Sequence, residues 1–168
     1  ILFCSLTSAS FSQTFTEVGQ IAGINHSVYS PALIGGGCAF FDYDNDGDLD
    51  GFVVNWYNKN NLAYINDGTG KFTQVLEGIW VNHFGYSETA AFGDYDNDGL
   101  VDLYVTNSAG TKKNFLYKNL GGNNMELVTG ISPVTDLFSS RNVSWSDIDS
   151  DGDLDLYVAN ENGEKENL

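Results

Sequence analysis

An eleven-residue block occurs three times in this chain, and no other feature limits the possible folds so strongly. The copies begin at Phe40, Phe92 and Trp145, so their starts lie 52 and 53 residues apart. Each copy alternates aspartate with other residues and then reaches a glycine, as in Asp-Tyr-Asp-Asn-Asp-Gly from Asp42. A period near 50 residues is typical of propellers and solenoids, in which each repeat is one supersecondary unit. The chain is therefore expected to consist of stacked units of similar structure.

Segments of strand length surround each block. Runs rich in β-branched and aromatic residues follow the three copies, at 51–55, 103–107 and 156–160. Residues 61–66 resemble 114–119, and turn residues at 66–70 precede a further strand-like run at 71–75. Each unit therefore reads strand, aspartate loop, strand, linker, strand, tight turn, strand, which describes a propeller blade. We predict an all-β fold with about three four-stranded blades of a β-propeller.

The length of the chain indicates a fragment of a larger ring. Propellers have four to eight blades, so even the smallest ring would need roughly 210 residues at this repeat length. We assign residues 14–168 to the propeller fragment. Residues 14–18 resemble the strand predicted near 72–75, as expected if the first strand completes the last blade of a ring.

Residues 1–13 are apolar and then rich in small residues, like the end of a secretory signal peptide. The alternative interpretation is a buried N-terminal strand. The first interpretation predicts a protein that is secreted and works outside the cell or at its surface.

The charge of the chain excludes two classes of partner. The formal net charge is −16, from 23 acidic and 7 basic residues, which would repel nucleic acid and anionic lipid surfaces. No apolar run after the N-terminus is long enough to cross a bilayer, so we expect no membrane insertion. Three nine-residue windows contain 14 of the 23 acidic residues, and this crowding is tolerable if cations neutralise it.

The aspartate loops have the composition of calcium sites. In the first loop, Asp42, Asp44, Asp46 and Asp50 occupy positions 1, 3, 5 and 9, and a glycine at position 6 allows the chain to turn sharply around an ion. The residue at position 7 differs in type between the loops, which suits a ligand that contributes only its backbone carbonyl. The candidate ligands are Asp42, Asp44, Asp46, Asp48 and Asp50 in the first loop, Asp94, Asp96, Asp98, Leu100 and Asp102 in the second, and Asp147, Asp149, Asp151, Asp153 and Asp155 in the third. Oxygen donors alone favour Ca²⁺, about one ion per loop and three in the chain.

The loops have two other possible interpretations. An EF-hand would need glutamate at position 12, where this chain has Val53, Val105 and Val158 within apolar runs. An acidic turn without metal is plausible for one isolated run, and three copies in the same register argue against it.

The three Asp-x-Asp-x-Asp-Gly-x-x-Asp loops, the aromatic residues before them and the opening segment 15–24 resemble FG-GAP/VCBS repeats. Such repeats occur in integrin α-subunit propellers and in secreted bacterial proteins, including those related to cartilage acidic protein. The resemblance implies a seven- or eight-bladed propeller with calcium in the loop between the first and second strands of each blade.

Two functions fit these features. The first is an extracellular binding or adhesion module in which calcium is structural and a propeller face contacts a protein or glycan. The alternative is a secreted polysaccharide lyase or hydrolase, or its accessory domain. We assign no catalytic residue, because His26 and His83 are expected to be solvated or hydrogen-bonded, and Glu88 and Arg141 to form an ion pair between blades.

The remaining aromatic and cysteine residues are expected to have structural roles. Trp56, Tyr57 and Trp80 could stack on sugar rings, although packing between blades is the favoured interpretation. Trp145 aligns with Phe40 and Phe92 and is expected in the core. Cys38 is expected to be a small buried apolar residue in a strand.

Overall fold

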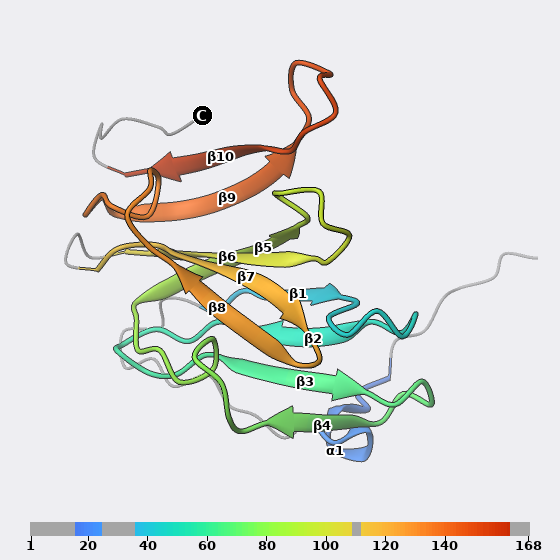
Figure 1. Cartoon of the computed structure of the whole chain (residues 1–168). Helices are drawn as coiled ribbons and strands as arrows, with labels where there is room; N and C mark the ends of the chain where they lie inside the picture. The colour runs from blue at the N-terminus through green and yellow to red at the C-terminus, as the bar shows by residue number, and fades with distance from the viewer. Residues whose placement is uncertain (1–15, 25–35, 109–111, 162–168) are drawn as a thin grey trace, which may run out of the picture.

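The computed structural model describes residues 16–24, 36–108 and 112–161, and within them the chain forms antiparallel sheets (Figure 1). The first blade has the strand order β1-β2-β3-β4 and the second β5-β6-β7-β8, while β9 and β10 form a two-stranded third sheet. The strands are β1 (Cys38–Phe41), β2 (Asp50–Val53), β3 (Leu62–Asn66), β4 (Phe72–Val75), β5 (Ser87–Gly93), β6 (Asp102–Asn107), β7 (Phe115–Gly121), β8 (Asn124–Val128), β9 (Ser140–Ser146) and β10 (Asp155–Asn160). The predicted all-β, propeller-like fragment is confirmed.

Each aspartate loop closes a β-hairpin at the same end of its sheet. The last residue of the first strand pairs with position 9 of the loop, as in Phe41 with Asp50 and Gly93 with Asp102. The third hairpin has the same pairing between Ser146 and Asp155. The turn between the third and fourth strands lies at this end too, since Asn66 pairs with Phe72. The strand-loop-strand order predicted from the repeat is therefore present in all three units.

The sheets stack face to face, and the apolar core lies between them (Figure 1). Between the two blades, Phe41 stacks on Phe92 with ring centroids 3.4 Å apart, and Trp80 is fully buried, as packing between blades predicts. Between the second blade and the third sheet, the core contains Tyr104, Leu116, Val134, Val143 and Val158. Trp145 is partly buried and packs against this second cluster.

Buried serines connect neighbouring sheets through asparagines. Ser87 Oγ, at the start of β5, accepts a hydrogen bond from Asn61 Nδ2 of the first blade (3.2 Å) and donates to Asn107 Oδ1 of its own blade (3.3 Å). Ser140 Oγ, at the start of β9, likewise accepts from Asn114 Nδ2 (2.8 Å) and donates to Asn160 Oδ1 (2.7 Å). The same polar link therefore recurs at both sheet-to-sheet contacts.

Cys38 is exposed, so the prediction of a buried cysteine is wrong. Cys38 and Phe40 lie on the side of β1 that faces away from the second blade, and Phe40 is 57% exposed. Their counterparts in later units pack against the sheet before them, as Ala90 and Val143 do. In the described part of the chain, no sheet precedes β1, so this face stays accessible.

The N-terminal segment also differs from expectation. Residues 16–18 belong to no strand, and α1 (Gly19–Ala22) follows them, ending at Gly23 with a left-handed φ of 94°. The amide of Ala22 donates to Val18 O, and Lys71 Nζ donates to Ile21 O, which holds this helical turn beside β4. The predicted strand at 14–18 is therefore wrong for residues 16–18. Residues 14 and 15 and the predicted signal peptide at 1–13 lie outside the described residues.

The sequence also predicts that no segment is inserted into a membrane. Among the described residues, no helix has the length and apolar character needed to cross a bilayer.

Candidate metal centres

In each loop, the carboxylates at positions 1, 3 and 9 come together. One oxygen from each of the three lies within 4.8 Å of the others. The groups are Asp42, Asp44 and Asp50; Asp94, Asp96 and Asp102; and Asp147, Asp149 and Asp155. A set of carboxylate oxygens without nitrogen or sulfur donors suits a hard cation such as Ca²⁺. Burial and the neighbouring charge of Asp46 raise the pKa of Asp44, as expected where like charges are crowded.

The carboxylate at position 1 holds each loop in its wrapped form. Asp42 Oδ1 accepts the amide of Asp46 (3.1 Å) and Asp42 Oδ2 accepts the amide of Gly47 (3.0 Å). The equivalent hydrogen bonds measure 3.0 and 2.9 Å in the second loop and 3.1 and 3.2 Å in the third. Gly47 has a φ of 94°, a conformation that side chains rarely adopt. The repeated glycine therefore allows the backbone to fold back onto the first aspartate.

The carboxylate at position 9 joins the aspartate loop to the second and third strands of its blade, and it is buried in the first two units. Asp50 accepts the amides of Tyr43 (2.9 Å) and Asn66 (2.8 Å), and it is 1% exposed. Asp102 is fully buried and accepts the amides of Tyr95 (3.1 Å) and Asn119 (2.7 Å).

Burial raises the pKa of Asp50, and it raises the pKa of Asp102 to about 6, while the amide hydrogen bonds act in the opposite direction. Asp155 accepts the amide of Ile148 (2.9 Å) in the same way. Position 9 thus fixes the loop to its sheet as well as offering a metal ligand.

The predicted ligands at positions 5 and 7 lie outside these three-residue groups. The position 5 carboxylates of Asp46, Asp98 and Asp151 each accept the amide of position 7 at 2.9 Å. The side chains of Asp48 and Leu100 at position 7 lie beside the turn glycines Gly68 and Gly121. The side chains of Asp48 and Leu100 are therefore directed to these turns. Binding of a metal by the backbone carbonyls of Asp48, Leu100 and Asp153 stays a prediction.

A lysine that the sequence interpretation did not include contacts the second loop. Lys118 Nζ, from β7, pairs with Asp96 and with Asp98 Oδ2, the latter at 2.9 Å. The hydrogen bond from Lys118 lowers the pKa of Asp98, and the two carboxylates raise the pKa of Lys118. In the first blade the equivalent residue is Ile65, which packs against the core. Only the second loop therefore has this pairing among the two loops whose third strand is described.

The loops also contact one another. Asn97 Nδ2 of the second loop donates to Asp153 Oδ1 of the third at 2.6 Å, and Asn45 Nδ2 of the first donates to Gly99 O of the second at 3.4 Å. Asn45 and Asn97 both have a positive φ, near 60°, which asparagine tolerates better than most residues. The three candidate centres thus form one row along the stacked sheets.

The residues considered for catalysis have structural contacts. His83 stacks on Phe115 (centroids 3.9 Å) and its Nδ1 lies 3.0 Å from Tyr117 Oη, so the hydrogen-bonded interpretation is confirmed. Burial and the charge of Lys112 lower the pKa of His83.

The predicted ion pair between Glu88 and Arg141 is present at 2.6 Å and joins the second blade to the third sheet, with Glu161 as a further partner of Arg141 at 2.6 Å. His26 lies outside the described residues.

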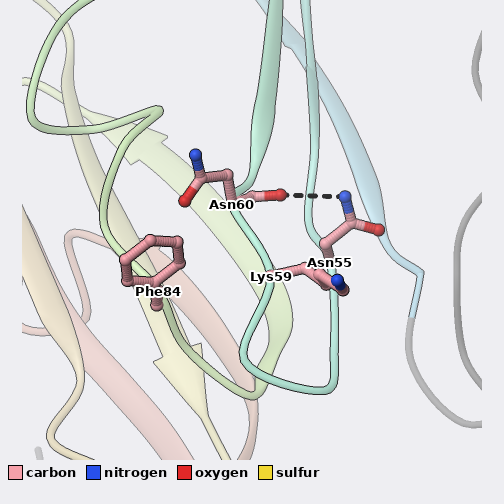
Figure 2. A pocket seen from close by; sticks show the side chains of 4 residues that line it. All are labelled: Asn55, Lys59, Asn60 and Phe84. Atoms are coloured by element: carbon pink, nitrogen blue, oxygen red, sulfur yellow. Dashed lines mark hydrogen bonds between the residues drawn. The ribbon is translucent and has the colours of Figure 1, made fainter.

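The end of the first blade opposite its aspartate loop carries an open pocket of about 440 Å³. Figure 2 shows its lining residues, with Asn55 Nδ2 donating to Asn60 O at 2.8 Å and Phe84 facing them. Phe84 is 54% exposed and the nearby Tyr57 is 50% exposed, whereas Trp56 donates to Ser108 Oγ of the second blade at 2.9 Å. Of the three aromatic residues considered for sugar binding, Tyr57 is thus the accessible one.

Comparison with known proteins agrees with this geometry. A family model described as FG-GAP-like repeat matches residues 42–105 and again 94–158. Each match begins at position 1 of one aspartate loop and extends into the strands of the following unit. Comparison with curated proteins gave no match. Because the two matches together span more than half of its length, the chain belongs to the FG-GAP-like repeat family.

Proposed function

We propose that this chain is part of a secreted, calcium-stabilised β-propeller that binds a protein or glycan outside the cell. FG-GAP repeats are propeller-like modules that are typically extracellular and often bind calcium. The observation that carries the proposal is the convergence of three aspartates in each of three equivalent loops. Those carboxylates, with the position 5 side chains and the position 7 carbonyls, would hold one Ca²⁺ per loop.

Calcium would stabilise the fold by neutralising charge. Without a cation, each loop brings three carboxylates within 4.8 Å of one another, which is unfavourable for like charges. Extracellular calcium modules bind with dissociation constants of about 10⁻⁴ to 10⁻³ M, so each site would add on the order of 1 kcal/mol at millimolar calcium. Since position 9 also bonds to the third strand, an ion at the loop would stabilise the whole blade.

We place the ligand-binding role at the end of the blades opposite the aspartate loops. Exposed aromatic rings of Phe84 and Tyr57 and the polar residues of the pocket in Figure 2 gather there. Aromatic and amide side chains together suit either a glycan or a protein surface.

The first test is thermal unfolding of the whole chain in chelator, followed by back-titration with calcium and then with magnesium. We expect a large rise in Tm that is specific for calcium and saturates with about one ion per loop. Triple replacement of the position 3 aspartates, Asp44, Asp96 and Asp149, by alanine should abolish the rise, because alanine offers no side-chain oxygen to the ion. An unchanged Tm on adding calcium would mean that the loops are acidic turns, and a screen of activity on acidic polysaccharides would then follow.

A further inference from the structure

We propose that Lys118 acts as a built-in counter-ion of the second aspartate loop and makes it a weaker calcium site than the first. This inference rests on the proposed calcium function and concerns the difference between sites. Its basis is the contact of one ammonium group with Asp96 and Asp98, the carboxylates at positions 3 and 5 of that loop.

The first and second blades are otherwise closely equivalent at this point. Asn66 and Asn119, the residues that follow Ile65 and Lys118, each donate their amide to the position 9 aspartate of their own blade. Because the strand registers agree, position 65 in the first blade corresponds to position 118 in the second. The substitution of lysine for isoleucine thus introduces a charge beside one loop only.

The cation competes directly with a metal for the same oxygens. Asp96 belongs to the convergent group with Asp94 and Asp102, so the ammonium shares a carboxylate that a metal would need. The side chains of Lys118, Asp96 and Asp98 are only 28%, 29% and 33% exposed, which limits screening by water. Calcium entering this loop would have to displace the ammonium group.

The charges of the loops point in the same direction. The first loop has five aspartates, a formal charge of −5, and no basic residue at position 65. The second has Leu100 in place of a fifth aspartate, so its four aspartates and Lys118 leave a formal charge of −3. A loop with more negative charge attracts a divalent cation more strongly, so the second loop should bind calcium more weakly than the first.

The lysine has a second partner when it leaves the loop. Glu126 on β8 lies directly opposite Lys118 in the β7–β8 register, where the first blade has Thr73 opposite Ile65. Opposite charges at facing positions of neighbouring strands attract one another. The second blade therefore combines a displaceable cation with an acidic residue that can receive it, and at low calcium the lysine neutralises part of the charge of its loop.

The test follows each loop separately in the whole chain by calcium titration with ¹H–¹⁵N NMR. Gly47, Gly99 and Gly152 occupy position 6, and their amides donate to position 1, so each reports on its own loop. We expect the Gly99 signal to respond at about tenfold higher calcium than the Gly47 signal. Lys118→Met should lower the Gly99 midpoint toward that of Gly47, while Lys118→Arg should leave it high.

The control is Lys113→Met, which removes the same charge just before the start of β7, on the side away from the aspartate loop. It should leave the Gly99 midpoint unchanged. If Gly47 and Gly99 respond together in the unmodified chain, or Lys118→Met does not move Gly99, the role of Lys118 is disproved while the calcium function stands. If none of the three glycines responds to calcium, the proposed function itself fails.

Discussion

The buried aspartate at position 9 illustrates how a single residue serves two purposes in this fold. Asp50 is one of the three carboxylates that converge in the first loop, and it also accepts amides from Tyr43 and Asn66. Asp46, at position 5, is exposed and accepts only the amide of Asp48. The two residues should therefore affect stability in different ways when replaced.

We predict that Asp50→Ala destabilises the chain with and without calcium, whereas Asp46→Ala does so only with calcium. Asp50→Ala leaves two amides without their acceptor, and relief of a buried charge offsets part of the loss, so the cost should be about 1 kcal/mol in chelator. In chelator, Asp46→Ala should stay within about 0.5 kcal/mol of the unmodified chain. Urea unfolding in chelator and in millimolar calcium measures both. Equal losses for the two variants in chelator would contradict the structural role of position 9.

At this scale, the sequence predicted that the carboxylates at positions 1, 3 and 9 would converge, and it did not predict the contacts around them. The spacing of aspartates and glycine indicated which carboxylates would meet, because a short loop with a fixed turn brings alternate residues to one point. The role of position 9 in binding the third strand depends on the amide of Asn66, sixteen residues away. Lys118 contacts its loop only once β7 has paired with β6, so its position relative to the loop follows from the sheet rather than from local spacing.

At the scale of the elements, stacked sheets are joined by hydrogen bonds as well as by apolar packing. Ser140 is fully buried at the start of β9 and links Asn114 of the second blade to Asn160 of β10. Ser144 lies on the same strand, is exposed, and donates only to the backbone of Trp145 at 3.4 Å. The two serines form a matched pair for testing this link.

We predict that Ser140→Ala lowers the free energy of unfolding by about 1–3 kcal/mol, because it leaves buried amide groups without their hydroxyl partner. Ser144→Ala, the control, should change it by less than about 0.5 kcal/mol. Urea unfolding monitored by tryptophan fluorescence would measure both. A loss for Ser140→Ala no larger than the control's would show that the link between sheets is energetically neutral.

The repeat predicted the strands to within about a residue at most ends, because runs of Val, Tyr, Phe and Leu alternate with turn residues. The segment at 16–18 was mistaken for a strand, since a resemblance to residues 72–75 cannot reveal that Gly19 and Gly23 permit a local helical turn. The serine link was missed, although Ser87 and Ser140 are separated by 53 residues, the period of the repeat. Alignment of polar residues at the repeat period would have detected it.

For the molecule as a whole, the position occupied by Phe40, Phe92 and Trp145 shows how units join. Phe92 stacks on Phe41 of the sheet before it, and Trp145 lies edge-on to Tyr104 with centroids 6.2 Å apart. Phe40, at the same position of the first blade, is 57% exposed. The aromatic side chain at this repeat position thus fills the contact between sheets in the second and third units, and it lies on an accessible face in the first.

We predict that this face makes the chain self-associate and that Phe40→Ser reduces the association without loss of stability. Phe40 buries little surface within the chain, so its replacement should change the free energy of unfolding by less than about 0.5 kcal/mol. Phe92→Ser removes a ring from the core between blades and should cost about 3 kcal/mol or more. Sedimentation velocity over a range of concentrations would measure association, and Leu120→Ser, which removes an exposed apolar side chain near the β7–β8 turn, is the control. If Phe40→Ser destabilised the chain as much as Phe92→Ser, Phe40 would be buried in solution. The face of β1 that carries Phe40 would then be covered by another part of the protein, which would contradict the prediction of self-association through it.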